Sequence, residues 1–203
     1  MPMQIIILTS LVIISSVFAT ITWLFFDALK IRIEIKSLLK GVGSLILTVA
    51  FTLLTIDQLS SRVKIGPNLI FYLQALGFWL IFSAFTFDAH AKLRLLWILA
   101  IISLFLLRDY TLLATQSLMI AIVCLSIAKL TKHNDLIPFG VAFVQISAAE
   151  FFFKLEEGGG LKGIGSAGYF LYIFASILLF LWLWSYLVIR FNINKSLRVK
   201  GRI

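Results

Sequence analysis

Seven long, mostly apolar stretches separated by short charged segments constrain this chain more than any other feature of its sequence. They lie near residues 4–26, 41–57, 67–87, 93–107, 110–129, 136–154 and 167–189. About 20 apolar residues in a helix, rising 1.5 Å each, cross the roughly 30 Å hydrocarbon layer of a bilayer. The pattern predicts an all-α integral membrane protein: a bundle of about seven transmembrane helices that forms a single polytopic domain over residues 1–203.

Composition leads to the same class of protein. Apolar residues make up 61% of the chain and charged residues 13%, whereas a soluble domain is about half apolar and about a quarter charged. So apolar a chain cannot cover a core with polar surface, and the lipid bilayer is its expected partner. The first stretch is expected to be a retained helix, because residues 1–4 lack the positive charge of a signal peptide and the apolar run extends to Phe26.

The fourth stretch is the shortest. Only thirteen residues separate Arg94 from Arg108, which corresponds to about 20 Å of helix. Crossing the bilayer there requires Arg94 to extend its charge toward the interface or the bilayer to become thinner. The next helix is then expected to follow a very tight turn at Arg108-Asp109.

The distribution of Lys and Arg predicts the orientation, because cytoplasmic loops are enriched in these residues. With seven spans and the N-terminus outside, thirteen of the 18 lie on the cytoplasmic side and five outside. The outer ones are Arg62, Lys64, Arg108, Lys154 and Lys162. Residues 190–203 are expected to form a basic cytoplasmic tail, and the plasma (inner) membrane is the expected location.

Topology and anionic inner-leaflet lipid account for the net charge of +9, so no nucleic acid partner is predicted. Catalytic and metal sites are not predicted either. The two histidines, His90 and His133, lie at span ends, and the single Cys124 excludes a multi-thiolate site. No cofactor is expected.

Several polar side chains are expected at membrane depth, where such groups normally face a bundle interior or a cavity. Four are candidate ligand-binding residues, and two carboxylates mark the rim of the bundle. The ligand-binding candidates are Gln74, Gln116, Gln145 and Glu150, and the rim carboxylates are Asp57 and Asp109. One interpretation is an outward-opening pocket between the third, fifth and sixth stretches.

The alternative is that the polar side chains hold helices together, each contributing about 0.5–1 kcal/mol. Glu150 has an alternative of its own, since Lys154 follows at i+4 and the two could form a hydrated surface pair. Helical spacing also turns Glu150 about 140° away from Gln145, so the two side chains are not expected to share a narrow site.

Two further patterns have structural explanations. Tyr169 and Tyr172 fit an outer aromatic belt, and Trp182, Trp184 and Tyr186 fit an inner one. The segment from Gly163 to Gly168 matches GxGxxG but lacks the βαβ context of a nucleotide site, so a flexible outer loop is expected.

Three functions from different classes are open. The first is a non-enzymatic membrane-embedded interaction or sensor module, which packs against a partner protein or a second copy of the chain and binds a small ligand in the outer half. The second is a small-solute transporter or channel that uses the glutamine layer and Glu150 as its path. The third is a lipid-active enzyme that uses Asp57, Asp109 and Glu150 for acid–base chemistry.

Overall fold

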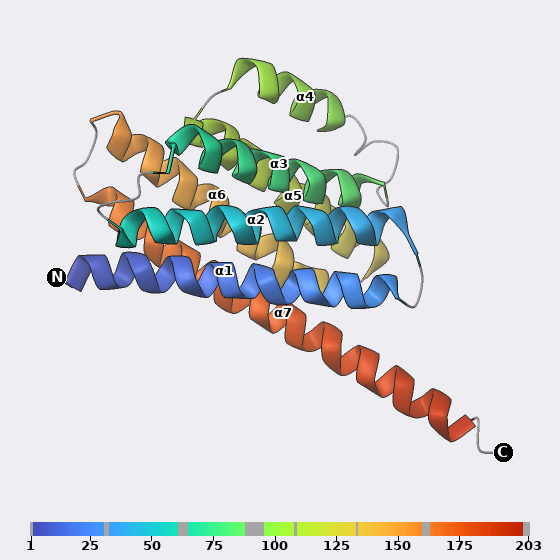
Figure 1. Cartoon of the computed structure of the whole chain (residues 1–203). Helices are drawn as coiled ribbons and strands as arrows, with labels where there is room; N and C mark the ends of the chain where they lie inside the picture. Colours follow the sequence, from blue (N-terminus) through green and yellow to red (C-terminus); the bar gives the residue numbers. More distant parts are fainter. Residues whose placement is uncertain are drawn as a thin grey trace.

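The computed structural model describes residues 2–30, 33–60, 65–87, 96–107, 109–132, 134–159 and 163–200. Throughout these ranges the only regular secondary structure is helical (Figure 1). The helices are α1 (Pro2–Leu29), α2 (Ile35–Leu59), α3 (Pro67–Thr86), α4 (Leu96–Leu106), α5 (Asp109–Thr131), α6 (Leu136–Glu157) and α7 (Ile164–Lys200).

Six of these helices are long and apolar enough to cross a membrane: α1, α2, α3, α5, α6 and α7. Many of their large apolar side chains face outward, including Ile5, Trp23 and Phe174, which are 64%, 61% and 54% exposed. Lipid is the solvent that favours such a surface. The chain is therefore a multi-pass helical membrane protein, as the apolar pattern predicts.

The fourth predicted span, residues 93–107, differs from the other six. Its described helix, α4, contains 11 residues, about 16 Å at 1.5 Å each, which is too short to cross the hydrocarbon layer by itself. The helix lies at the edge of the bundle and contacts mainly α5 and α3 (Figure 1). Trp97 anchors its first turn by donating a hydrogen bond from Nε1 to Thr86 Oγ1, 2.6 Å away. Residues 88–95, which include the first three of the predicted span, and Arg108 lie outside the described residues.

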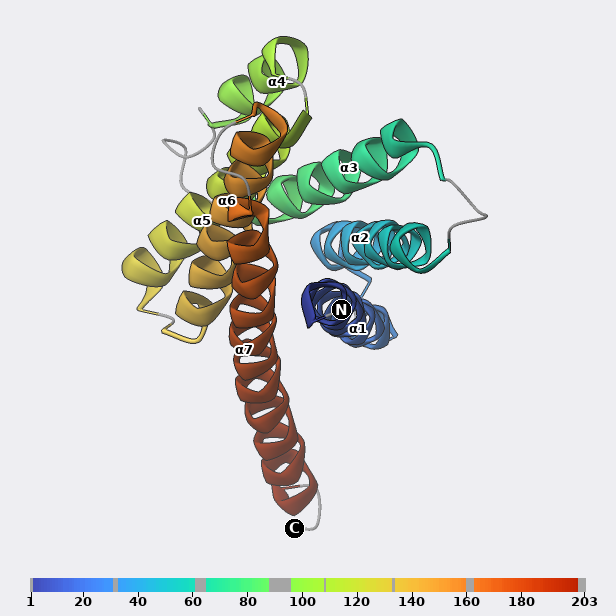
Figure 2. The ribbon, with the colours of Figure 1, turned by 90° about the vertical axis from the view of Figure 1, so that its left-hand side faces the viewer.

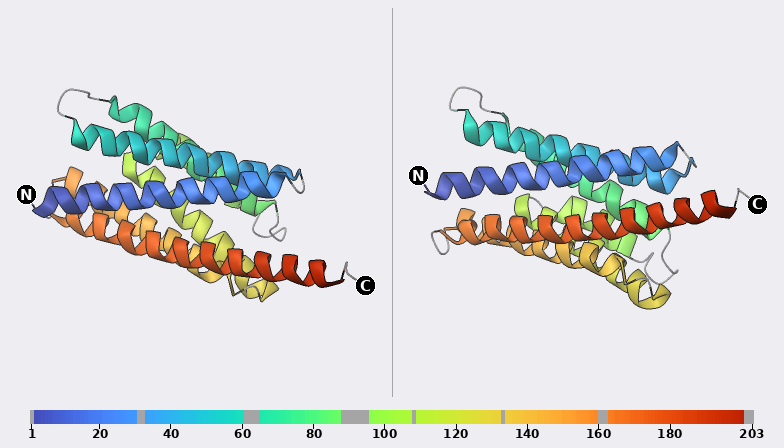
Figure 3. Two further views of the ribbon diagram at one scale, coloured as in Figure 1. Left: turned by 60° about the horizontal axis from the view of Figure 1, so that its bottom comes forward. Right: turned by 90° about the horizontal axis from the view of Figure 1, so that it is seen from below.

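The helices alternate in direction, and the two chain ends lie at opposite ends of the bundle (Figures 1 and 3). Helix α7 lies between the α1–α2 pair and the α5–α6 pair (Figure 2). It is 37 residues long, about 55 Å, and runs past the other helices. The helix therefore continues through most of the segment predicted as a tail.

The core is aromatic and closely packed. Phe18, Phe51, Phe78 and Phe143 are fully buried, and Phe18 stacks on Phe51 with ring centroids 5.8 Å apart. Ring-to-ring packing of this kind stabilises the bundle beyond the effect of burial alone. This core fills the middle of the bundle. Polar side chains such as Asp57, Asp109 and Glu150 lie toward the end of the bundle that contains the N-terminus.

Candidate functional site

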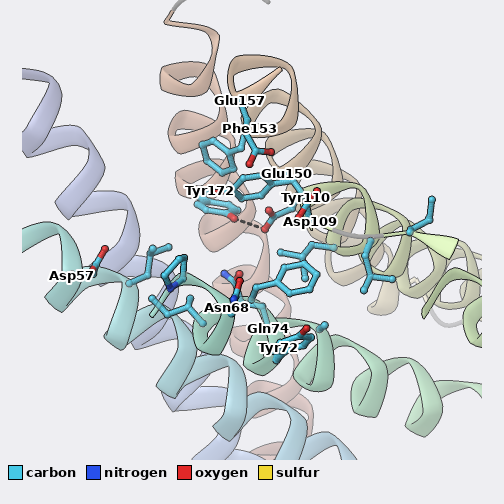
Figure 4. A pocket seen from close by; sticks show the side chains of 18 of the residues that line it. Asp57, Asn68, Tyr72, Gln74, Asp109, Tyr110, Glu150, Phe153, Glu157 and Tyr172 are labelled. Atoms are coloured by element: carbon cyan, nitrogen blue, oxygen red, sulfur yellow. Dashed lines mark hydrogen bonds between the residues drawn. The ribbon is translucent and has the colours of Figure 1, made fainter. Parts of the chain in front are cut away.

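A pocket of about 950 Å³ opens at the end of the bundle where α3, α5 and α7 begin. Its walls come from every described helix except α1. Figure 4 shows that polar and aromatic side chains from these helices converge on it. Pockets that hold small molecules have volumes of this order, with apolar walls and a few placed polar groups.

Glu150 forms part of the pocket wall, yet its side chain has 0% exposure. Tyr172 Oη donates a hydrogen bond to Glu150 Oε1 at 2.5 Å. The other carboxyl oxygen, Oε2, is buried and has no hydrogen-bond partner. A buried acceptor without a donor costs about 1–3 kcal/mol, and more when the group is charged, so this oxygen is a place where a ligand can contribute binding energy.

Close packing of α6 on α7 brings Glu150 to Tyr172. A Cβ atom at Gly168 would lie 2.7 Å from the Phe153 ring and 3.1 Å from the carbonyl oxygen of Ala149, so only glycine lets the helices approach this closely. Glu150 and Phe153 are three residues apart on α6, as Tyr169 and Tyr172 are on α7, and side chains at that spacing share a helix face. The two pairs therefore face each other across the contact.

Four aromatic rings pack together beside the carboxyl group, and one of them, Tyr172, donates to it. The Phe153 ring centroid lies 4.9 Å from that of Tyr169, 5.5 Å from that of Tyr172 and 5.7 Å from that of Tyr110 on α5. A second link ties α6 to α5, since Ser147 Oγ donates to the carbonyl oxygen of Ala114 at 2.7 Å. Three helices thus hold one polar group inside an aromatic cluster, which we call the Glu150 cluster: Tyr110, Glu150, Phe153, Tyr169 and Tyr172.

The pocket is acidic along its described walls. Four of the residues lining it carry carboxyl groups and none is Lys, Arg or His; the four are Asp57, Asp109, Glu150 and Glu157. Lys154 Nζ lies 3.4 Å from Asp109 Oδ2 and 2.9 Å from Glu157 Oε2. Asp57 Oδ1 accepts a hydrogen bond from the backbone N–H of Ile65 at 3.0 Å. Asp57 therefore has a hydrogen-bond donor nearby, and Asp109 and Glu157 each have a positively charged neighbour. Glu150 Oε2 has no hydrogen-bond partner.

The six polar residues singled out in the sequence separate into two groups. Gln74, Glu150, Asp57 and Asp109 line the pocket, whereas Gln116 and Gln145 are absent from its described walls. Gln116 is 2% exposed, and neither its oxygen nor its nitrogen has a hydrogen-bond partner. Gln145 Oε1 is likewise buried without one.

Lys154 does not pair with Glu150 in the structure. The i+4 spacing suggested a hydrated Glu–Lys pair, but the Lys154 ammonium contacts Asp109 and Glu157 at the bundle rim, and Glu150 is fully buried. The GxGxxG segment also differs from the predicted flexible loop, because α7 begins at Ile164 and both Gly165 and Gly168 are helical. Of these two glycines, Gly168 permits the close approach of α6 to α7.

Tyr172 is the functional candidate that sequence reasoning missed. Its position near a span end fits an aromatic belt, but the ring is 1% exposed and its hydroxyl contacts Glu150. Trp182, assigned to the inner belt, is also buried, at 4%. The sequence features that could have indicated Tyr172 are the i, i+3 pairs Glu150–Phe153 and Tyr169–Tyr172, together with the glycine at position 168.

Comparison of the chain with models of protein families, with curated proteins and with solved structures finds no match.

Proposed function

We propose that this protein is a membrane-embedded sensor module that binds a small ligand in the pocket around Glu150 and packs against a partner protein or a second copy. The observation that carries the proposal is Glu150 Oε2, a buried oxygen without a partner in the wall of a pocket of about 950 Å³. An ionisable side chain at membrane depth is expensive to keep there, and such groups usually serve binding or transport.

The continuity of α7 supports a sensor. Tyr172, which contacts Glu150, lies on the same unbroken helix as the segment that runs past the other helices at the opposite end of the bundle. A ligand that changes the Glu150–Tyr172 contact can shift or rotate this helix, because packed helices move as rigid elements. Ligand occupancy on one side of the membrane then alters the surface offered to a partner on the other side.

The topology that belongs to this proposal has seven crossings, with the N-terminus and the pocket outside and the C-terminus in the cytoplasm of a cell with a plasma membrane. Chain ends at opposite ends of the bundle favour an odd number of crossings, and α3 and α5 run in the same direction (Figure 1). The proposal therefore includes one crossing between α3 and α5. The excess of Lys and Arg on the side of the C-terminus supports the orientation.

Small-molecule retention tests the proposal. The protein is purified in mild detergent from its native membrane, and compounds released on denaturation are identified by mass spectrometry. We expect a compound at near-stoichiometric amount with the unaltered protein and with Gln145→Leu, and a clear loss with Gln74→Leu, because Gln74 lines the pocket and Gln145 is absent from its described walls. Equal retention by the two variants would contradict the proposed site, and an empty protein that binds no added compound would contradict the function.

A small-solute transporter is the second candidate, and the orphaned glutamines favour it. Gln145 lies five residues below Glu150 on α6, about 7 Å deeper in the bundle, and Gln116 lies at comparable depth on α5. A row of unsatisfied polar atoms leading inward from the pocket resembles the lining of a solute path. Flux of the retained compound into liposomes, lost in Gln116→Leu while binding persists, would favour transport over sensing.

A further inference from the structure

We infer that the pocket recognises an organic ammonium ion whose N–H group donates to Glu150 Oε2 and whose charge lies among the rings of the Glu150 cluster. The inference rests on the proposed function and names the chemical class of its ligand. It applies equally to a free amine and to the ammonium headgroup of a phospholipid, since both present the same group.

The first support is the missing donor. Glu150 Oε1 already accepts from Tyr172, and Oε2 accepts from nothing. A primary, secondary or tertiary ammonium supplies the donor and the positive charge together. Charge-assisted hydrogen bonds of this type are roughly twice as strong as neutral ones. An uncharged donor would supply the hydrogen bond but not the positive charge.

The second support is the aromatic wall. Tyr110, Phe153, Tyr169 and Tyr172 form a cluster of four packed rings, and the Tyr172 hydroxyl donates to the carboxyl group. Ring faces attract cations electrostatically, and cages of such rings are a recurrent means of recognising ammonium groups. An anionic ligand would meet the negative faces of these rings and the carboxyl group at once, so the wall discriminates against it.

The third support is the charge of the remaining wall. The described lining carries four carboxyl groups and no basic side chain. At the rim an ammonium group of the protein itself, Lys154 Nζ, lies 3.4 Å from Asp109 Oδ2 and 2.9 Å from Glu157 Oε2, an ammonium–carboxylate contact of the kind inferred for the ligand. Acidic walls also raise the local concentration of cations at the entrance.

A metal ion fits the site less well. Among the residues that the structure describes, no three His, Cys, Asp or Glu side chains come together as a metal-binding group. Hard divalent cations require six or more oxygen ligands or retained waters, and aromatic rings supply neither. The apolar remainder of the pocket, including Phe71, Leu112 and Leu113, instead fits a hydrocarbon body attached to the ammonium.

Matched probes test the inference. Binding of 4-phenylbutylammonium and of its uncharged counterpart 4-phenylbutanol is measured by calorimetry on the purified full-length protein. We expect the ammonium to bind about tenfold or more tightly than the alcohol, since only the cation satisfies a buried carboxyl group. Equal affinities, or tighter binding of the alcohol, would overturn the inference without the need for any variant.

Glu150→Gln assigns the preference to one residue. The amide oxygen still accepts from Tyr172 while the negative charge is removed, so the ammonium should lose its advantage of about tenfold. Asp27→Asn is the matched control, because it removes a carboxylate near the opposite end of the bundle and should retain the preference. If Glu150→Gln kept the full preference, Glu150 would not be the counter-ion. Phe153→Leu, which removes a ring and no charge, should weaken the ammonium more than the alcohol.

Varying the lipid composition distinguishes a free amine from a phospholipid headgroup as the source of the ammonium group. The probe is titrated into nanodiscs of phosphatidylglycerol mixed with either phosphatidylethanolamine or phosphatidylcholine. Weaker apparent binding with the ethanolamine lipid supports a headgroup ligand, because its primary ammonium competes, whereas equal binding supports a free amine. The native compound could also prove to be neutral or anionic and be retained by the unaltered protein but not by Gln74→Leu. That result would overturn the ammonium inference and leave the proposed function in place.

Discussion

Two ionisable side chains lie against aromatic rings near opposite ends of this bundle, and they differ in how their charge is compensated. Near one end, Lys40 Nζ lies 4.2 Å from the centroid of the Phe85 ring and 5.9 Å from that of Phe25. Near the other, Glu150 lies among the Tyr110, Phe153 and Tyr172 rings. The ring faces attract the ammonium of Lys40 and offer no such attraction to a carboxylate.

The difference separates a structural group from a binding group. Lys40 obtains compensation from the rings that pack against it, so its site is complete within the folded chain. Glu150 has one hydrogen bond, one orphaned oxygen and acidic neighbours along the pocket wall. Buried polar groups in native proteins nearly always have a hydrogen-bond partner, so an unsatisfied carboxyl oxygen calls for an explanation. The predictions below test whether the two ends differ in this way.

The largest expected effect comes from separating the helices that form the Glu150 end. Gly168→Ala places a methyl group 2.7 Å from the Phe153 ring and 3.1 Å from a backbone oxygen, so we expect a loss of up to about 3 kcal/mol in stability. Gly66→Ala is the control, because nothing lies within 4 Å of its added Cβ. Thermal unfolding in detergent measures both, and similar melting temperatures for the two variants would argue against close packing of α6 on α7.

The next effect concerns the single hydrogen bond of Glu150. Tyr172→Phe leaves both carboxyl oxygens without a donor, which should cost about 1–3 kcal/mol. Paired with Glu150→Leu, which removes the acceptor, in a double-mutant cycle, the two changes should be coupled, because each removes one partner of the same bond. Additive changes in the free energy of unfolding would mean that the bond contributes nothing to stability.

A smaller effect is expected at the opposite end. Lys40→Met keeps the length of the side chain and removes its charge, so the loss of the attraction to Phe85 should cost about 0.5–2 kcal/mol. Affinity for 4-phenylbutylammonium should not change. A weakened affinity would show that the two ends are not independent, and the comparison would then fail.

The smallest effect is expected at the rim. Lys154→Gln removes an ammonium that is about one-third exposed and bridges Asp109 and Glu157. Exposed pairs of this kind contribute little to stability and weaken with salt, so the melting temperature should change little. Binding of the ammonium probe should improve slightly at low salt, and calorimetry at two salt concentrations checks this. Weaker binding would contradict an acidic entrance.

The lengths of the apolar stretches were sufficient to predict six long helices, whereas the fourth crossing stays a prediction. Six predicted spans coincide with helices long enough to cross a membrane, because about 20 apolar residues in lipid have few alternatives to a helix. Residues 93–107 lack that length, and α4 covers 11 of them. Orientation depends on loop charges alone, so it stays a prediction.

The candidate site was less accessible to sequence reasoning. Glu150 could be singled out because an ionisable residue in an apolar stretch is rare, but its partner could not. Tyr172 resembles a belt residue in sequence, and its burial depends on the contact between α6 and α7 at Gly168. Such contacts join residues whose pairing follows from the packing of the whole bundle, which periodicity within one helix does not encode.

The claim that Glu150 binds the ammonium group is tested most directly by following the absorption of its carboxyl group while the ligand binds. Infrared difference spectra are recorded for the purified protein with and without 4-phenylbutylammonium, alongside Glu150→Gln and Asp27→Asn. We expect a ligand-induced change in the carboxyl bands that persists in Asp27→Asn and disappears in Glu150→Gln. Carboxyl bands that change identically in all three proteins would contradict the assignment of Glu150 as the group that binds the ammonium.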